Sequence, residues 1–257
     1  MKKPLLFVLP NESYFQSSFL DCFSKKIKNN DYYIKDIIVL KSKYKNSLQS
    51  YLLNNLTKLH IDEIIKLIIL KFFPNFYFRF IFKDKMNYST IKKIFKKYNY
   101  NVIYETNINK RKLANFIKKR NYSFIINTAN QIYNFELYSN YKKKIINIHL
   151  SLLPKYAGIW TIFQQLSNNE SNTGISIHKI NDNIDSGELI IRQKILLNKK
   201  LSLFENQIKC YENIPELLKL CCDNNFKSQK KIIPKKIFSY PNDHDWINFR
   251  RLKNKII

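Results

Sequence analysis

Short apolar runs alternate along most of the chain with stretches that have helical spacing. The apolar runs are rich in β-branched and aromatic residues, as is typical of buried strands, and cover 5–9, 34–40, 102–104, 124–127 and 145–149. Stretches with one apolar helical face cover 17–27, 91–98 and 110–120, and Ser89 and Thr90 can cap the second of them. Strands that alternate with helices predict an α/β fold with a Rossmann-like, mainly parallel twisted sheet flanked by helices.

The second half of the chain continues with a different pattern. A short helix over 160–166 precedes a strand over 174–180, in which Ile175 and Ile177 alternate with Ser176 and His178 as in a half-buried strand. A polar loop over 181–188 leads to another strand over 189–197. Two helices, 203–210 and 215–222, and a basic tail marked by prolines follow. We expect one principal domain over 1–200 and a small C-terminal helical extension and tail over 201–257.

The most apolar stretch of the chain runs from residue 64 to 82. Lys66, Lys71, Pro74 and Arg79 interrupt it, so a membrane-spanning helix is not expected. We expect a buried or dimer-forming helix here, and a segment lying on a membrane surface is the alternative. The apolar run at the N-terminus ends at Pro10 with no small-residue cleavage site after it, so it is interpreted as a first strand and not as a signal peptide.

The composition is that of a globular protein with an unusual charge. Lys and Arg number 45 against 19 Asp and Glu, a net charge of +26. Such a charge favours RNA or an anionic membrane as partner. Lys, Asn, Ile, Tyr and Phe are however all abundant while glycine is scarce, which indicates AT-rich coding DNA as part of the cause. The four cysteines form no CxxC pair, which is typical of free thiols in a reducing compartment, so we expect the cytoplasm.

The chain has only three glycines, at 158, 174 and 187, and they share one stretch with Asn147, His149 and Asp185. Glycine tolerates positive φ and close backbone approach, so the cluster predicts tight turns around a site. An amide, an imidazole and a carboxylate are suited to a polar reaction centre. A metal site formed by His149, His178 and Asp185 fits no standard ligand spacing, so no metal is expected, and His178 is interpreted as structural.

These residues form a series of motifs. Asn147-Ile-His149, Ser151-Leu-Leu-Pro154, Gly158, Thr173-Gly174 and Asp185-Ser-Gly187 together resemble the folate-dependent formyltransferases. The resemblance is strongest from 98 to 191 and extends to the opening strands, but none is detectable over 46–90. The tail, 239–251, also resembles the ending of bacterial amino-sugar N-formyltransferases.

The resemblance implies transfer of a formyl group from 10-formyltetrahydrofolate to a primary amine. Asn147 and His149 would form the oxyanion hole, while Asp185 would raise the pKa of the imidazole and accept the proton of the amine. The same resemblance implies contacts to the pterin from Asn130, Gln131, Ile132, Asn181 and Ile184. It places on the acceptor side Ser151, Leu153, Pro154, Tyr156 and Gly158.

The chain also departs from the family pattern. Leu150 and Ala157 stand where the family commonly has proline and arginine, and residues 10–13 replace a glycine-rich turn after the first strand. The tail match and the short stretch after the core favour a nucleotide-linked amino sugar as acceptor. The alternatives are a methionyl-tRNA formyltransferase, then a glycinamide ribonucleotide formyltransferase. A basic RNA- or membrane-binding protein on the same scaffold is a further alternative, and a homodimer is left open.

Overall fold

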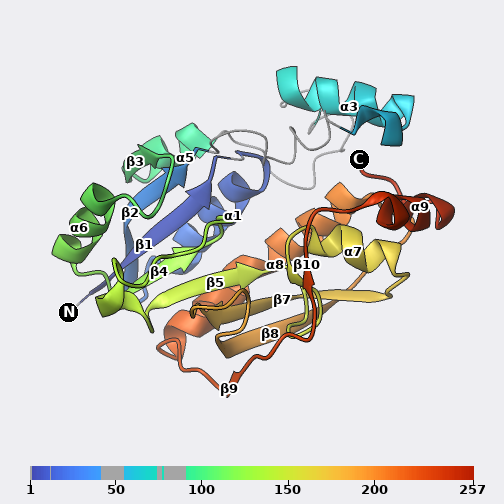
Figure 1. The fold of residues 1–257 in the computed structure, drawn as a ribbon. Helices are drawn as coiled ribbons and strands as arrows, with labels where there is room; N and C mark the ends of the chain where they lie inside the picture. Colours follow the sequence, from blue (N-terminus) through green and yellow to red (C-terminus); the bar gives the residue numbers. More distant parts are fainter. Residues whose placement is uncertain (1, 12, 42–54, 74–76, 78–90) are drawn as a thin grey trace.

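The computed structural model describes residues 2–11, 13–41, 55–73, 77 and 91–257. Within them, an eight-stranded sheet has the strand order β3-β2-β1-β4-β5-β7-β8-β9 (Figure 1). The strands are β1 (Lys3–Pro10), β2 (Tyr32–Leu40), β3 (Asn101–Glu105), β4 (Phe124–Asn127), β5 (Ile145–His149), β7 (Asn172–Lys179), β8 (Glu188–Leu196) and β9 (Lys230–Lys231). From β3 to β5 in this order the neighbours pair in parallel, and from β5 to β9 they pair antiparallel. The predicted mainly parallel α/β sheet is therefore confirmed.

Helices cover both faces of this sheet. They are α1 (Ser13–Lys26), α3 (Ile61–Phe72), α5 (Ile91–Lys97), α6 (Arg111–Arg120), α7 (Thr161–Ser167), α8 (Leu203–Asp223) and α9 (Asp243–Arg251), with 3-10 turns η1 (Leu56–Lys58) and η3 (Ser139–Tyr141). One core joins the sheet to α1, α3, α5, α7, α8 and α9, and a second core joins the opposite face to α6 and the segment that leads to β5. Strand β1 lies between the two cores, because Leu5, Phe7 and Leu9 face the first and Leu6 and Val8 the second.

Strand β7 and helix α8 differ from the prediction. The strand was expected to have one polar, solvated face, but Ser176 and His178 are buried, because both faces of β7 lie inside the protein. Two helices were expected around Pro215, but α8 runs through it without a break. Pro215 and its neighbours Ile214 and Leu217 are buried. We attribute the continuity to this burial, which offsets the hydrogen bond that proline removes.

The tail after α8 adds to the fold. Strand β9 joins the edge of the main sheet, and β10 (Ile237–Phe238) pairs in parallel with β6 (Ala157–Gly158). Helix α9 packs on α7, where the rings of Phe163 and Phe249 are stacked at 4.3 Å. The last residues therefore support the segment that follows β5.

Helix α3 is attached to the rest of the protein through one apolar face, on which Leu70 belongs to the first core, and through one buried carboxylate. Glu63 is fully buried and accepts hydrogen bonds from both terminal nitrogens of Arg250 on α9 and from the backbone N–H of Ile256. An unpaired carboxylate here would be strongly destabilising, so these partners hold α3 beside the C-terminus, as Figure 1 shows.

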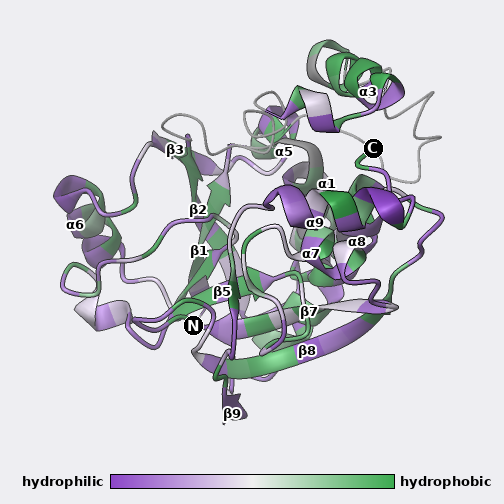
Figure 2. Ribbon diagram, turned by 45° about the vertical axis from the view of Figure 1, so that its right-hand side comes forward, coloured by the Kyte–Doolittle hydropathy of each residue, from purple (hydrophilic) through white to green (hydrophobic). Residues whose placement is uncertain are grey.

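The opposite face of α3 is exposed and apolar, and most of this helix has the colour of hydrophobic residues in Figure 2. Ile61, Ile65, Ile68 and Phe72 are each at least half exposed, so the expectation of a buried helix is wrong for this face. No helix among the described residues is long and apolar enough to cross a membrane. Pro74, Arg79, Ser89 and Thr90 lie outside the described residues. A dimer formed through this helix stays a prediction.

Gly158 lies where the tail meets the segment after β5. Its φ of +104° is a backbone conformation that residues with a side chain rarely adopt. A Cβ atom here would also collide with the carbonyl oxygen of Phe238. The pairing of β6 with β10 therefore depends on glycine at this position.

We expect Gly158→Ala to lower the free energy of unfolding by about 1–3 kcal/mol, the usual cost of one residue held in a strained backbone conformation. The added methyl group also pushes β10 away. Urea unfolding followed by circular dichroism measures the change. Asn121, at φ 47° after α6, is the matched control, because Asn121→Gly relieves strain and should be neutral or stabilising. Unchanged stability in Gly158→Ala would contradict the structural role of β6.

Candidate active site

Asn147 and His149 lie at the carboxyl end of β5. Because side chains alternate along a strand, both point to the same face of the sheet. This edge of a parallel sheet is where ligands bind in open α/β folds. His149 is only 6% exposed, whereas Asn147 is partly accessible. The two groups predicted to share an oxyanion thus sit where the sheet fold places a ligand.

Asp185 reaches the same edge from the loop between β7 and β8. Its backbone has a φ of 48°, unusual for a residue other than glycine, and its carboxylate accepts a 2.7 Å hydrogen bond from the N–H of Gly158. Asn181 holds the loop, because its side chain donates to the carbonyl of Ser186 and accepts from the Ser186 hydroxyl. Gly187 lets the loop close, since a Cβ atom there would collide with the carbonyl of Lys179.

The structure brings the three predicted catalytic side chains together. Asp185 Oδ2 lies 3.5 Å from His149 Nδ1, and Asp185 Oδ1 accepts from Asn147 Nδ2 at 3.4 Å. His149 Nε2 lies 2.8 Å from the carbonyl oxygen of Tyr156. Because a carbonyl oxygen only accepts, this ring nitrogen carries a proton. The site therefore contains an amide donor, an imidazole donor and a carboxylate.

A fourth residue, His178, belongs to this cluster. Its Nε2 atom lies 3.5 Å from Asp185 Oδ1 and 3.3 Å from Asn147 Nδ2, and the side chain is 1% exposed. The sequence interpretation of His178 as purely structural missed this contact. The antiparallel pairing of β5 with β7 sets His178 opposite Asn147, and the sequence alone carries no signal of this register.

Burial and charge act in opposite directions on the titrating groups. Burial lowers the pKa of His149 below its usual 6.5, and the attraction of Asp185 opposes this without outweighing it. The expected effect of Asp185 on the imidazole is therefore present, but the net direction is opposite to the prediction. Burial alone would raise the pKa of Asp185, yet the two imidazoles and the N–H of Gly158 lower it below 3.8. The site therefore holds an acidic carboxylate beside an imidazole that is harder to protonate than a free one.

The residues predicted for the donor lie on two loops, one after β4 and one between β7 and β8. The side chain of Gln131 binds the backbone at Ile108 and Thr106, so it fixes the loop before α6. Asn130 and Ile132 are exposed after β4, and Ile184 is 42% exposed beside Asp185. Asn181 is engaged within its own loop. Their contact with a pterin stays a prediction.

The residues predicted for the acceptor lie on the segment between β5 and α7. Ser151 and Leu153 are fully buried, and the Ser151 hydroxyl donates to the carbonyls of Lys155 and Tyr156, so these two residues shape the loop from within. Pro154 is exposed, and Tyr156 is partly exposed with its ring stacked on Phe238.

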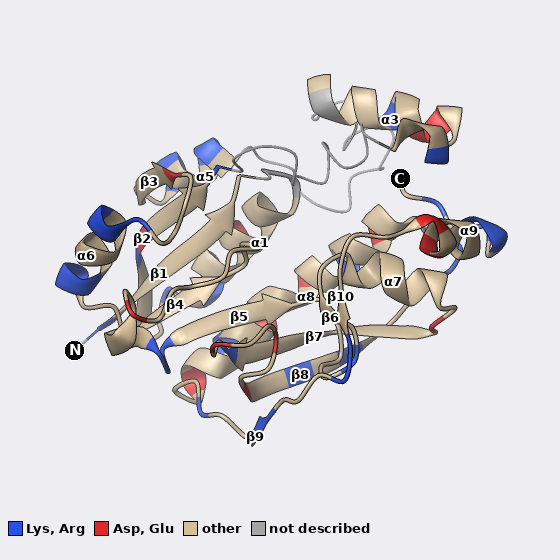
Figure 3. Cartoon of the chain, viewed as in Figure 1, with Lys and Arg blue, Asp and Glu red and all other residues tan. Residues whose placement is uncertain are grey.

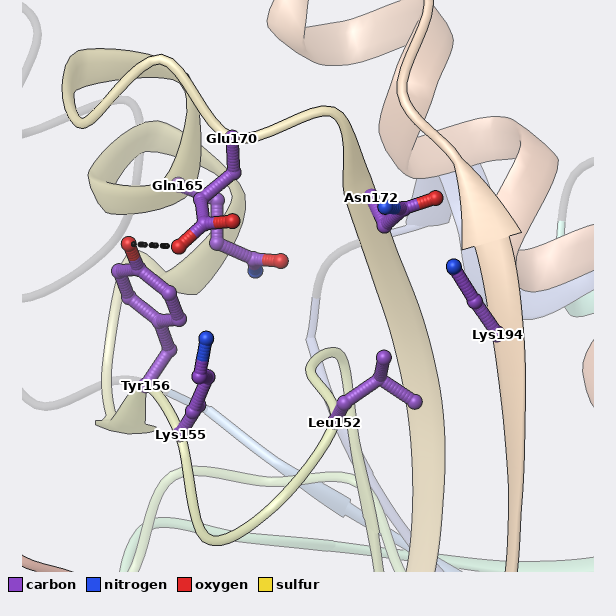
Figure 4. A pocket seen from close by; sticks show the side chains of 7 residues that line it. All are labelled: Leu152, Lys155, Tyr156, Gln165, Glu170, Asn172 and Lys194. Atoms are coloured by element: carbon purple, nitrogen blue, oxygen red, sulfur yellow. Dashed lines mark hydrogen bonds between the residues drawn. The ribbon is translucent and has the colours of Figure 1, made fainter.

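A hollow of about 190 Å³ opens beside Tyr156 (Figure 4). It is lined by Leu152, Lys155, Tyr156, Gln165, Glu170, Asn172 and Lys194. The amino groups of Lys155 and Lys194 extend into it, and the phenol of Tyr156 donates to Glu170 at 3.0 Å. Pockets for drug-sized ligands measure about 300–1,000 Å³, so this hollow accommodates a fragment of a nucleotide sugar at most.

The described residues include no group of His, Cys, Asp and Glu side chains arranged to hold a metal ion. The side chains of His149 and His178 both lie 3.5 Å from the carboxylate of Asp185. Both histidines also bind the main chain, His149 at Tyr156 and His178 at Lys179.

Comparison with known proteins identifies the family. The family model described as formyl transferase matches residues 83–213, about half of the chain. The chain therefore belongs to the formyl transferase family.

Curated relatives match shorter parts of the chain. Phosphoribosylglycinamide formyltransferase of Escherichia coli (strain K12) is 42% identical over 57 residues, 22% of this chain and 27% of that protein. Methionyl-tRNA formyltransferase of Finegoldia magna is 31% identical over 81 residues, 32% of this chain and 26% of that protein. GDP-perosamine N-formyltransferase of Brucella melitensis is 37% identical over 70 residues, 26% of this chain and 27% of that protein. The match thus spans about a quarter of each relative.

Solved structures share the fold over most of the chain. Phosphoribosylglycinamide formyltransferase from Bacillus halodurans has a TM-score of 0.60 at 15% identity, covering 86% of this chain and 94% of that one. A sugar 3N-formyl transferase crystallised in the presence of dTDP and 5-N-formyl-THF has a TM-score of 0.56 at 16% identity, covering 98% of this chain and 82% of that one.

The lowered pKa of His149 predicts how stability depends on pH. As the pH falls below 6.5, the unfolded chain gains a proton at this histidine before the folded protein does, so the free energy of unfolding should fall. Urea midpoints at about pH 7.5 and 5.0 measure the drop. His149→Asn should show a smaller drop, whereas His244→Asn, at an exposed position on α9, should keep that of the wild type. Equal drops in all three proteins would contradict the prediction.

Proposed function

We propose that this protein transfers a formyl group from 10-formyltetrahydrofolate to a primary amine. The observation that carries the proposal is the convergence of Asn147, His149 and Asp185 at one edge of the sheet. Family membership supports it. The folate is a substrate of this reaction, and the residues of the site supply binding and proton transfer.

The geometry suits attack of an amine on a formyl carbon. As the new C–N bond forms, the formyl oxygen becomes negative, and Asn147 Nδ2 and the N–H at His149 Nε2 donate to it. The oxygen competes with the Tyr156 carbonyl for the imidazole proton. Asp185, ionised beside these donors, accepts the amine proton directly or through water. The oxygen then re-forms its carbonyl as the bond from carbon to the folate nitrogen breaks, and that nitrogen takes up the proton that Asp185 accepted.

We propose a nucleotide-linked amino sugar as the acceptor. The GDP-perosamine N-formyltransferase relative supports a sugar, although it matches over only 26% of this chain. The sugar 3N-formyl transferase structure supports it at the level of the fold, because its similarity extends over 98% of the chain. The four cysteines are free thiols, which fits the reducing cytoplasm, where we place the reaction.

Methionyl-tRNA is the second candidate acceptor. The relative from Finegoldia magna supports it, as does the net charge of +26, because tRNA is a polyanion. Lys and Arg are spread over α5, α6, α9 and strands β8 and β9, without concentration on one element (Figure 3). The phosphoribosylglycinamide relative keeps a third acceptor open.

Purified protein should release tetrahydrofolate from 10-formyltetrahydrofolate when a nucleotide-linked amino sugar is supplied. Asn147→Ala should lower kcat by about a hundredfold to a thousandfold, the usual cost of one lost oxyanion donor. Asn168→Ala, on the exposed turn after α7, is the matched control and should keep wild-type turnover. Turnover with charged initiator tRNA but with no amino sugar would identify methionyl-tRNA as the acceptor. Absence of turnover with every amine would refute the proposed reaction.

The dependence on salt concentration distinguishes an enzyme from a basic RNA-binding protein with the same fold. Binding through six or more phosphates loses about a thousandfold in affinity between 50 and 200 mM salt, whereas turnover of a small sugar substrate should change far less. Initial rates and RNA binding, measured across that range, make the comparison. Tight RNA binding at moderate salt without folate turnover would favour the binding protein.

A further inference from the structure

The orientation of the Asn147 side chain decides whether it can serve in an oxyanion hole. Its amide has a donating and an accepting end of nearly the same shape, and only the NH₂ end stabilises a negative oxygen. Asp185 Oδ1 and His178 Nε2 lie on the NH₂ side, at 3.4 and 3.3 Å. What binds the oxygen of this amide therefore matters for the proposed reaction.

Asn127 binds that oxygen. Strands β4 and β5 are parallel and in register, which sets Asn127 directly beside Asn147. Asn127 Nδ2 donates to Asn147 Oδ1 at 3.0 Å and to the carbonyl of Ala129 at 2.9 Å. Both of its amide hydrogens are thus directed at oxygen atoms. A reversed Asn127 would place its own oxygen against two others, so the Ala129 carbonyl fixes which way it points.

Tyr133 fixes the other end of Asn127. Its phenol donates to Asn127 Oδ1 at 3.2 Å, and both side chains are almost fully buried. Burial raises the pKa of the phenol well above 10, so it stays protonated and remains a donor. The ring is held by an edge-to-face contact with Tyr138, 5.3 Å between centroids.

His178 completes the series on the far side of Asn147. Its Nδ1 atom lies 3.0 Å from the carbonyl of Lys179, so this nitrogen carries the proton. Its Nε2 atom lies 3.3 Å from the NH₂ nitrogen of Asn147 and 3.5 Å from Asp185 Oδ1. A donor on Asn127 therefore faces the oxygen of the Asn147 amide, and the carboxylate of Asp185, an acceptor, faces its nitrogen.

We infer that Tyr133 and Asn127 are positioning residues that hold the Asn147 amide with its NH₂ toward the substrate. The inference rests on the proposed function for its catalytic meaning. We name the hydrogen-bonded series Tyr133–Asn127–Asn147 the amide relay. Its first two members do not touch the substrate, and they act through Asn147 alone.

The decisive variant is Asn127→Leu, which keeps the volume of the side chain and removes the donor. We expect kcat to fall by about tenfold to a hundredfold through misplacement of the amide, with KM for donor and acceptor within about twofold. Tyr133→Phe should give a smaller loss in the same direction. In an Asn147→Ala background, Asn127→Leu should lower kcat no further, because Asn127 acts on the reaction through Asn147 alone.

Thr128→Val is the matched control. Thr128 follows Asn127 and donates a side-chain hydrogen bond to Gln16, away from Asn147. It should keep wild-type kcat while losing a comparable amount of stability. A merely structural role for Asn127 would instead lower kcat in both backgrounds, and that outcome would overturn the inference, as would wild-type kcat in Asn127→Leu.

A readout without turnover separates this inference from the proposed function. In protein labelled with ¹⁵N-asparagine, the side-chain NH₂ signals of Asn147, assigned by their loss in Asn147→Ala, should shift in Asn127→Leu and stay in place in Thr128→Val. If the wild type transfers no formyl group but these shifts occur, the proposed reaction fails and the hydrogen-bonded relay stands. Unshifted signals in Asn127→Leu would overturn the relay, whatever the activity.

Discussion

The carboxylate of Asp185 is the group on which the arrangement of the site depends. It is mostly buried, and a buried charge is costly unless other groups compensate it. The compensation comes from separate parts of the chain: the N–H of Gly158, the amide of Asn147 and the imidazoles of His149 and His178. Strand β5, strand β7 and the segment after β5 must all be in place before this charge is stabilised, so the site depends on contacts between distant parts of the chain.

Much of the fold could be predicted from the sequence, because buried strands and helices with one buried face differ in the spacing of their apolar residues. Strands β4 and β5 have the predicted bounds, since each is an apolar run that ends at a polar side chain on the sheet edge. Helix α8 could not be predicted in full, because its continuity through Pro215 depends on packing against distant residues. The tail posed the same problem, since the two residues of β10 gain their partner from β6 and have no strand pattern of their own.

The candidate site could be predicted in part for a related reason. Asn147 and His149 are two positions apart on one strand, so the sequence places them on one face, and the family motifs supplied Asp185. Asn127 and His178 were missed because each reaches Asn147 from a neighbouring strand. Only the register of β5 with β4 and β7 brings them there, and no spacing along the chain records that register.

The pairing of β6 with β10 has a consequence for synthesis of the protein on the ribosome. Ala157 and Gly158 leave the exit tunnel well before their partners at Ile237 and Phe238 are translated. The parallel core of β1 to β5 has all its strands by then and is free to form early. Strand β6, whose Gly158 N–H binds the carboxylate of Asp185, cannot pair with β10 until the tail has emerged. The surroundings of the Gly158 N–H that binds Asp185 are therefore completed only after translation has reached the tail.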